Sequence, residues 1–260
     1  MKMTTREHTK QIKIGDITIG GSNKVLIQSM CNIKTSKVDE VVKQINECTL
    51  LGADLMRVSV LDMEDAKAIK EIVSQISVPL IADIHFDYRL AIESINSGVS
   101  AVRLNPGNIG SEENVKKVLD LCKEKHIPIR IGVNSGSIDK NVNNNTNVVK
   151  AKELVESAEK TVKMLEKYCF YDIVISLKGS HVLETVEAYK LASKKFKYPL
   201  HLGITEAGPK DIGLIRSTAG LAPILLSGIG DTIRVSLTGD PVEEIKSAKL
   251  ILRTLGLRKG

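Results

Sequence analysis

The chain has 260 residues, of which 42% are hydrophobic and only 3% aromatic, and its formal net charge at pH 7 is +6. This length allows one large domain or two small ones, with a core packed mainly by aliphatic side chains. No stretch approaches the roughly 18 apolar residues of a membrane helix, the N-terminus has no apolar signal segment, and no basic run alternates with aromatics. We therefore expect a soluble cytoplasmic protein that binds neither membrane nor nucleic acid, and whose charge suits an anionic ligand.

Short apolar runs alternate with amphipathic segments along the whole chain. The first 23 residues contain a hairpin candidate with Gly15 and Asp16 at its turn, which we expect to plug the bottom of the fold. Eight runs of strand length follow, at residues 24–30, 54–60, 79–84, 100–105, 128–133, 172–177, 199–204 and 231–237. A segment with helical periodicity comes after each of them, at residues 38–51, 63–76, 87–97, 111–125, 150–168, 181–195, 210–227 and 241–255.

This alternation predicts a (β/α)8 TIM barrel. Strands and helices that alternate form parallel sheets through right-handed crossovers, and eight units in about 250 residues match the size of this fold. Glycines end three of the helical segments, at Gly52, Gly98 and Gly228. A doubly wound open sheet is the alternative, but no G-x-G-x-x-G motif follows the first strand. We divide the chain into a hairpin plug at residues 1–23 and a barrel domain at residues 24–260.

Four arginines interrupt runs that otherwise have the composition of buried strands. A buried guanidinium without a counter-charge costs several kcal/mol, so four of them in equivalent places predict an anionic ligand. Alternation along the strands places these arginines on the side that faces the barrel interior, together with most other polar side chains of the strands. The arginines are Arg57, Arg103, Arg130 and Arg234. The polar residues that share their side are Gln28, Ser59, Asp83, His85, Asn105, Asn134, Ser176, Lys178, His201, Thr205 and Ser236.

A barrel interior this polar predicts an active-site floor, because such interiors are ordinarily filled by Val, Ile and Leu. An internal network in which Asp83 and Glu206 neutralise the arginines is the alternative, but two carboxylates cannot balance four guanidiniums and Lys178. The Asn-rich segment at residues 141–147 extends the loop after the fifth strand, either as a solvated insertion or as a lid. Gly- or Ser-rich turns that feed helices suggest places for phosphate oxygens, at residues 105–110, 132–137, 178–180 and 238–240.

Few titratable residues are candidates for chemistry. Glu206 could act as a general acid or base, and Lys178, which should lose its proton more readily among cations, could be an electrostatic clamp or a Schiff-base amine. His85 and His201 could be ligand donors or satisfied core groups. Cys31 is more typical of packing than of a nucleophile.

Seven motifs of this chain carry a family resemblance. They are QSM (28–30), GADLMRVSV (52–60), PLIADIHFDYRLA (79–91), RLNPGNIG (103–110), PIRIGVNSGS (128–137), HLGITEAG (201–208) and GIGDTIRVSLTGDPVEEI (228–245). Together they closely resemble the 4-hydroxy-3-methylbut-2-enyl diphosphate synthase family, the iron-sulfur oxidoreductases of the methylerythritol phosphate route to isoprenoids. The resemblance implies reductive opening of 2-C-methyl-D-erythritol 2,4-cyclodiphosphate to the linear allylic diphosphate, with uptake of two electrons and loss of water.

The resemblance also implies roles for individual residues. Glu206, in TEAG, would be the acid or base that serves the departing hydroxyl. Asp83 and His85 would hold the substrate's hydroxyls or the clamp itself. The clamp on the two phosphates would consist of Arg57, Arg103, Arg130, Lys178 and Arg234, with Asn105 and Asn134 as hydrogen-bond donors beside them and His201 in the same site.

The cofactor and partners follow from the resemblance as well. The family holds a [4Fe-4S] cluster by three cysteines and a glutamate in a domain after the barrel, and this chain stops at Gly260, where that domain would begin. The spacing of Cys48, Cys122 and Cys169 matches no cluster pattern. We therefore expect a barrel that holds no metal itself and binds the cyclic diphosphate without reducing it. A full-length enzyme would use ferredoxin or flavodoxin as electron donor and form a homodimer in which each barrel faces its partner's cluster domain.

Three other functions remain open from the sequence. A class I aldolase is one, because Lys178 ends the sixth strand, where such barrels carry their Schiff-base lysine. A pterin-binding barrel related to dihydropteroate synthase is another, since it shares the architecture and the polar floor. The third is a non-catalytic anion-binding remnant.

Overall fold

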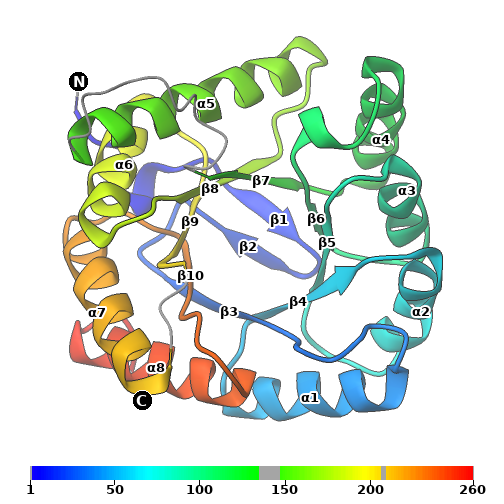
Figure 1. The fold of residues 1–260 in the computed structure, drawn as a ribbon, viewed down its shortest axis with the longest axis horizontal. Coiled ribbons are helices and arrows are strands. Elements are labelled where there is room, and N and C mark those ends of the chain that lie inside the picture. Colours follow the sequence, from blue (N-terminus) through cyan, green and yellow to red (C-terminus); the bar gives the residue numbers. More distant parts are fainter. Residues whose placement is uncertain (1, 135–146, 206–208, 260) are drawn as a thin grey trace.

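The computed structural model describes residues 2–134, 147–205 and 209–259. Within these residues, eight parallel strands close into a barrel and eight α-helices surround it (Figure 1). A two-stranded antiparallel hairpin lies across one end of the barrel. The predicted (β/α)8 fold with an N-terminal hairpin is confirmed. No helix in this described part is both long and apolar enough to cross a membrane.

The strands follow one another around the barrel in chain order, and the last strand, β10, closes it by pairing with the first, β3. The barrel strands are β3 (Leu26–Met30), β4 (Leu55–Val60), β5 (Leu80–Ile84), β6 (Ala101–Arg103), β7 (Ile129–Asn134), β8 (Ile173–Lys178), β9 (Leu200–Gly203) and β10 (Thr232–Arg234). The helices are α1 (Val38–Leu51), α2 (Met63–Val73), α3 (Tyr88–Asn96), α4 (Glu112–Lys125), α5 (Asn147–Lys167), α6 (Val182–Lys195), α7 (Lys210–Leu226) and α8 (Pro241–Thr254).

The predicted boundaries agree with the structure to within three residues. The difference at the last strand has a visible cause: β10 ends at Arg234 and not at Leu237, and the Leu237 backbone N–H donates to the Glu244 carboxylate outside the sheet. Two short 3-10 helices, η1 (Arg6–His8) and η2 (Pro106–Asn108), were not predicted.

The hairpin fills the N-terminal end of the barrel. Its strands β1 (Ile12–Ile14) and β2 (Ile17–Ile19) pair with Ile12 opposite Ile19, and Gly15 makes the turn at a φ of +60°. Three hairpin isoleucines pack on the lowest inward-facing layer of the barrel. The residues of this buried cluster are Ile12, Ile14, Ile19, Leu26, Leu55, Ile81, Ala101 and Val174. The interior is therefore apolar at this end, and polar side chains are confined to the other.

The N-terminal segment is tied to the barrel by a buried arginine. The Arg6 guanidinium donates hydrogen bonds to the backbone carbonyls of Gly230, Leu225 and Ile229 and to the Asn23 side chain. One carbonyl in the last turn of α7 and two in the loop after it are thereby satisfied, and the segment that leads into the hairpin is held in place.

The outward-facing side chains of the strands form the main core beneath the helices, as the alternation predicts. Each of them is at most 2% exposed, except where a strand end meets solvent, and each buried side chain of this size contributes about 1.5–3 kcal/mol. They include Met56, Val58, Val102, Leu104, Ile129, Ile131, Leu200, Leu202, Ile233 and Val235. This layer leaves the interior of the barrel free to carry polar groups.

Candidate active site

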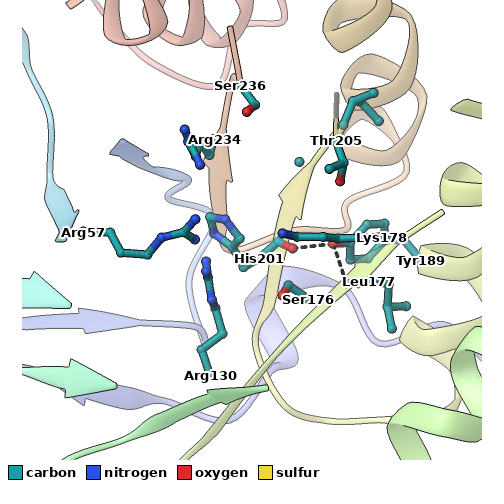
Figure 2. Close-up of a pocket in the computed structure, with 12 residues that line it drawn as sticks. Arg57, Arg130, Ser176, Leu177, Lys178, Tyr189, His201, Thr205, Arg234 and Ser236 are labelled. Carbon is teal, nitrogen blue, oxygen red and sulfur yellow. Dashed lines mark hydrogen bonds between the residues drawn. The ribbon is translucent and has the colours of Figure 1, made fainter. Parts of the chain in front are cut away.

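The four predicted arginines converge inside the C-terminal mouth of the barrel. Arg57, Arg103 and Arg130 are 5%, 7% and 4% exposed, and the Arg234 side chain is 19% exposed. Figure 2 shows the guanidinium groups of Arg57, Arg130 and Arg234 pointing toward one another from three strands, with His201 between them. The pocket at this position is lined by Arg57, Arg130, Ser176, Leu177, Lys178, Tyr189, His201, Gly203, Ile204, Thr205, Arg234 and Ser236.

Asp83 is the carboxylate that two of the arginines share. Its oxygens lie 3.5 Å from Arg57 Nε and 3.3 Å from Arg103 Nη1. Burial raises the pKa of Asp83, but the charges of Arg57, Arg103 and Arg130 outweigh it and hold the pKa below its usual value. Burial also lowers the pKa of Arg57 to about 10, which Asp83 partly opposes, so that both groups remain charged at neutral pH.

A second carboxylate, Glu244, was missed by the sequence argument, which counted only Asp83 and Glu206. Glu244 lies in the first turn of α8 and is 3% exposed. Its oxygens accept from Arg234 Nε and Nη2, both at 3.2 Å, and from Ser29 Oγ at 2.6 Å. Arg234 is therefore neutralised by a two-pronged ion pair with a helix that packs outside the barrel.

Arg130 contacts no carboxylate in the described part of the chain. Its Nη1 lies 3.3 Å from Gln28 Oε1, whereas Arg130 Nε and Gln28 Nε2 are buried without a hydrogen-bond partner. Burial and the charges of Arg57 and Arg103 lower the pKa of Arg130 well below its usual value. An arginine keeps its proton even when burial and neighbouring cations lower its pKa, so Arg130 is a buried charge without a carboxylate partner among the described residues, in a position suited to receive an anion.

The described residues of the site have a surplus of positive charge. Four guanidiniums and Lys178 give five cations, and Asp83 and Glu244 give two anions, so the difference is three positive charges. A phosphate oxygen placed about 4 Å from such a charge gains roughly 4 kcal/mol at an effective dielectric near 20. The geometry is therefore suited to a ligand with more than one negative charge.

Lys178 and His201 complete the floor of the pocket. Burial, and then the charges of Arg103, Arg57 and Arg130, lower the pKa of Lys178 to about 8, in the direction that the sequence argument predicted. Burial and the neighbouring arginines likewise lower the pKa of His201 well below its usual value, so its imidazole is neutral. His201 Nδ1 lies 2.7 Å from Thr232 Oγ1, which orients the ring.

Tyr189, on α6, is a further pocket residue that the strand-based argument could not find. Its hydroxyl accepts a hydrogen bond from the Leu177 backbone N–H and donates one to the His201 carbonyl, as the dashed lines of Figure 2 show. It thereby joins β8 to β9 next to Lys178 and at His201. Tyr189 thus supports two polar residues of the floor.

The remaining candidates lie in different places. Asn105 Oδ1 accepts from the Gly132 N–H at 3.0 Å, and Asn134 is exposed at the end of β7. His85 follows the end of β5. It lines a neighbouring cleft together with Phe86 and is not among the residues of the arginine pocket. Glu206 lies outside the described residues, as does most of the Asn-rich segment.

Gly132 makes the space that Arg103 occupies. A Cβ atom on Gly132 would lie 2.7 Å from Arg103 Nη2 and 3.2 Å from Ser176 Oγ. We expect Gly132→Ala to displace the end of the Arg103 side chain and to weaken anion binding about tenfold, with a change in unfolding free energy below about 1 kcal/mol. Calorimetric titration and thermal unfolding measure both quantities. Gly107→Ala is the matched control, because nothing lies within 4 Å of its added Cβ; equal affinities of the two variants would contradict the prediction.

The cysteines do not fit the iron-sulfur cluster that the resemblance implies. Burial raises the pKa of Cys31, Cys48 and Cys122 to about 12, so these thiols are protonated in the metal-free protein and are poor nucleophiles. Cys169 is exposed and stands apart after α5. Among the residues that the structure describes, no group of three or more His, Cys, Asp or Glu side chains could hold a metal ion.

Comparison with known proteins decides the family. The family model described as the GcpE TIM-barrel domain matches residues 9–249. A 4-hydroxy-3-methylbut-2-en-1-yl diphosphate synthase (flavodoxin) from Caldanaerobacter subterraneus subsp. tengcongensis is 56% identical over 254 residues, which are 98% of this chain and 72% of that protein. The chain belongs to this enzyme family. The relative of the same name from Clostridium perfringens is 55% identical over 254 residues, covering 98% of the chain and 73% of the relative.

Solved structures with a similar fold come from another enzyme. Dihydropteroate synthase from Stenotrophomonas maltophilia has a TM-score of 0.69 at 13% identity and covers 96% of this chain and 100% of that one. The enzyme from Yersinia pestis has a TM-score of 0.67 at 12% identity, covering 96% of this chain and 99% of that one. At this identity the likeness concerns the barrel architecture alone.

Proposed function

We propose that this chain binds 2-C-methyl-D-erythritol 2,4-cyclodiphosphate in the arginine pocket and serves its reductive conversion to 4-hydroxy-3-methylbut-2-en-1-yl diphosphate. The observation that carries the proposal is the surplus of three positive charges among the described residues of the barrel mouth, in a member of this family. A cyclic diphosphate brings two negative charges, close together and rigidly held. Its polyol portion offers hydroxyls to the neutral polar groups nearby, which include His201, Thr205 and Ser236.

The charge surplus suits the reaction as well as the binding. Conversion breaks the bond between C2 and its phosphate oxygen and releases the C3 hydroxyl as water. Written for the fully protonated cyclic diphosphate, the reaction takes up two electrons and two protons. A double bond forms between C2 and C3. Opening the ring leaves a terminal phosphate with one more ionisable oxygen, so negative charge grows on the phosphates during the reaction. Fixed cations that already face that position stabilise the developing charge without reorganisation.

Individual roles follow from this proposal. The phosphates lie among Arg57, Arg130, Lys178 and Arg234. Arg103 does not line the pocket and contributes through its ion pair with Asp83. Glu206 is the group we assign to protonating the departing hydroxyl. A [4Fe-4S] cluster would supply the two electrons, and no group of described residues could hold it. The electron donor would be flavodoxin, which the relatives' names give, and the assembly would be a homodimer.

Titration of the 260-residue chain with the cyclic diphosphate tests the binding step. We expect a dissociation constant of about 1 μM or tighter, and no detectable binding of 2-C-methyl-D-erythritol, which lacks the phosphates. Displacement of the cyclic diphosphate by a dihydropterin would favour a pterin-binding barrel instead. Borohydride trapping of a carbonyl compound on Lys178 would favour an aldolase. Absence of cyclic diphosphate binding would refute the proposal.

The lowered pKa of Lys178 predicts that binding weakens at alkaline pH. In the free protein this pKa is about 8, and a bound anion raises it, so binding takes up a proton above pH 8. The cyclic diphosphate does not titrate in this range, so the dependence belongs to the protein. We expect affinity to be nearly constant from pH 6.5 to 7.5 and to fall by up to about tenfold per pH unit above 8. Lys178→Met should bind more weakly throughout and lose this dependence; an unchanged slope in that variant would contradict the assignment.

A further inference from the structure

Met30 brings two of the site arginines together at one sulfur atom. Its Sδ lies 3.1 Å from Arg57 Nη2 and 3.3 Å from Arg57 Nε, and 3.7 Å from Arg234 Nη1. Met30 ends β3, the strand between β4, which carries Arg57, and β10, which carries Arg234. Met30 and Arg57 are also direct partners in the parallel register. Three neighbouring strands thus contribute one side chain each to a single contact.

The two arginines use this sulfur in different ways. Arg57 directs the two-nitrogen edge formed by Nε and Nη2 at Sδ, and its nearest carboxylate oxygen, on Asp83, lies 3.5 Å from Nε. Arg234 directs its corresponding edge at Glu244 and offers only Nη1 to the sulfur. Each guanidinium group is therefore held along one edge, and its remaining N–H groups are not taken up by the contacts given above.

The chemistry of a thioether fits this position. Sulfur is a soft, weak hydrogen-bond acceptor without charge, so it orients a guanidinium while cancelling none of its positive potential. A carboxylate in its place would neutralise the pair and reduce the charge surplus. A purely aliphatic side chain would fill the same volume but leave the Arg57 edge with no acceptor at this point, and a buried N–H without an acceptor is costly.

We propose that Met30 is a positioning residue, whose thioether holds Arg57 and Arg234 in the orientation that receives the anionic groups of the ligand. The inference deepens the proposed function, on which it rests for the identity of the natural ligand. The positioning effect itself concerns any small polyanion, so inorganic pyrophosphate is a suitable probe.

The test compares three variants of the 260-residue chain by calorimetric titration with pyrophosphate. Met30→Leu removes the acceptor and keeps the volume, and we expect it to weaken binding by about three- to tenfold. Met30→Gln returns an uncharged acceptor of similar length and should recover most of the affinity. Met56→Leu is the matched control, because Met56 is fully buried on the outward side of β4, and it should bind as the wild type does.

Salt dependence separates positioning from loss of charge. Met30→Leu leaves the number of cations unchanged, so its affinity should fall with ionic strength as steeply as that of the wild type, whereas Arg234→Ala should flatten the dependence. Thermal unfolding of the Met30 and Met56 variants shows whether packing alone has changed.

Several outcomes would overturn the inference. The inference is wrong if Met30→Leu binds pyrophosphate as tightly as the wild type does. It is also wrong if Met30→Leu and Met30→Gln lose the same amount of affinity, or if the wild type does not bind pyrophosphate at all. Binding of pyrophosphate with the expected Met30 effect, but no binding of the cyclic diphosphate, would refute the proposed function and support the role of Met30.

Discussion

Replacing Arg130 by methionine should weaken binding of the cyclic diphosphate at least about a hundredfold and, at the same time, stabilise the ligand-free protein by about 1–3 kcal/mol. Arg130 is 4% exposed, has Gln28 as its hydrogen-bond partner and contacts no carboxylate within the described residues. In the free protein its charge is therefore a cost, and in the complex it is a major source of affinity. Calorimetric titration and chemical denaturation of the same preparation measure both effects.

Arg234→Met is the matched comparison, because Arg234 has a counter-ion and Arg130 has none among the residues that the structure describes. Removing it leaves Glu244, which is 3% exposed, as a buried carboxylate without its ion-pair partner. We expect this variant to lose affinity as well, but to lose about 3 kcal/mol of unfolding free energy instead of gaining stability. If both variants changed stability in the same direction, the assignment of Arg130 as the uncompensated charge would be wrong.

Replacing Asp83 by alanine should destabilise the free protein, whereas Arg130→Met should stabilise it. Arg57 and Arg103 share this carboxylate, and its loss raises the surplus of positive charge among the described residues of the site from three to four. In a buffer without polyvalent anions, we expect the free energy of unfolding to fall by about 3–5 kcal/mol. An excess of pyrophosphate should restore much of that stability, because an anion that binds only the folded state stabilises it.

Asp120→Ala controls for the general effect of removing a carboxylate. Asp120 lies on α4 and pairs with Lys116 and Lys123 at the surface, where ion pairs contribute little, so a change below about 1 kcal/mol is expected. Asp83→Asn should fall between the two, since the amide oxygen still accepts from one arginine. An Asp83→Ala protein as stable as the wild type, or one that pyrophosphate fails to restore, would show that Asp83 is not the counter-ion we assign.

Strand alternation was sufficient to predict most of the pocket. Arg57, Arg130 and Arg234 face inward because successive side chains of a strand point to opposite sides, and this local rule needs no knowledge of the fold. His85 shows where the rule stops. It follows Ile84, the last residue of β5, and once the strand has ended its side chain enters a neighbouring cleft.

Residues that reach the site from outside the strands could not be predicted in this way. Glu244 faces the barrel because of the rotation of α8, which depends on where the helix begins, and its pairing with Arg234 depends on how the helix packs. Tyr189 likewise reaches its partners from α6. Met30 was visible in the sequence, but as an apolar residue, and its contact with two guanidiniums is a property of the assembled strands.

Glu244 also lies at the seam where the barrel closes. The first and last barrel strands, β3 and β10, are paired at Thr232 with Leu26 and at Ile233 with Ile27, and above these pairs Glu244 accepts from Ser29 on one strand and Arg234 on the other. The same carboxylate thus bridges the joint of the barrel and holds one arginine that lines the pocket. A change at Glu244 would therefore affect the pairing of the first and last strands and the orientation of Arg234 together.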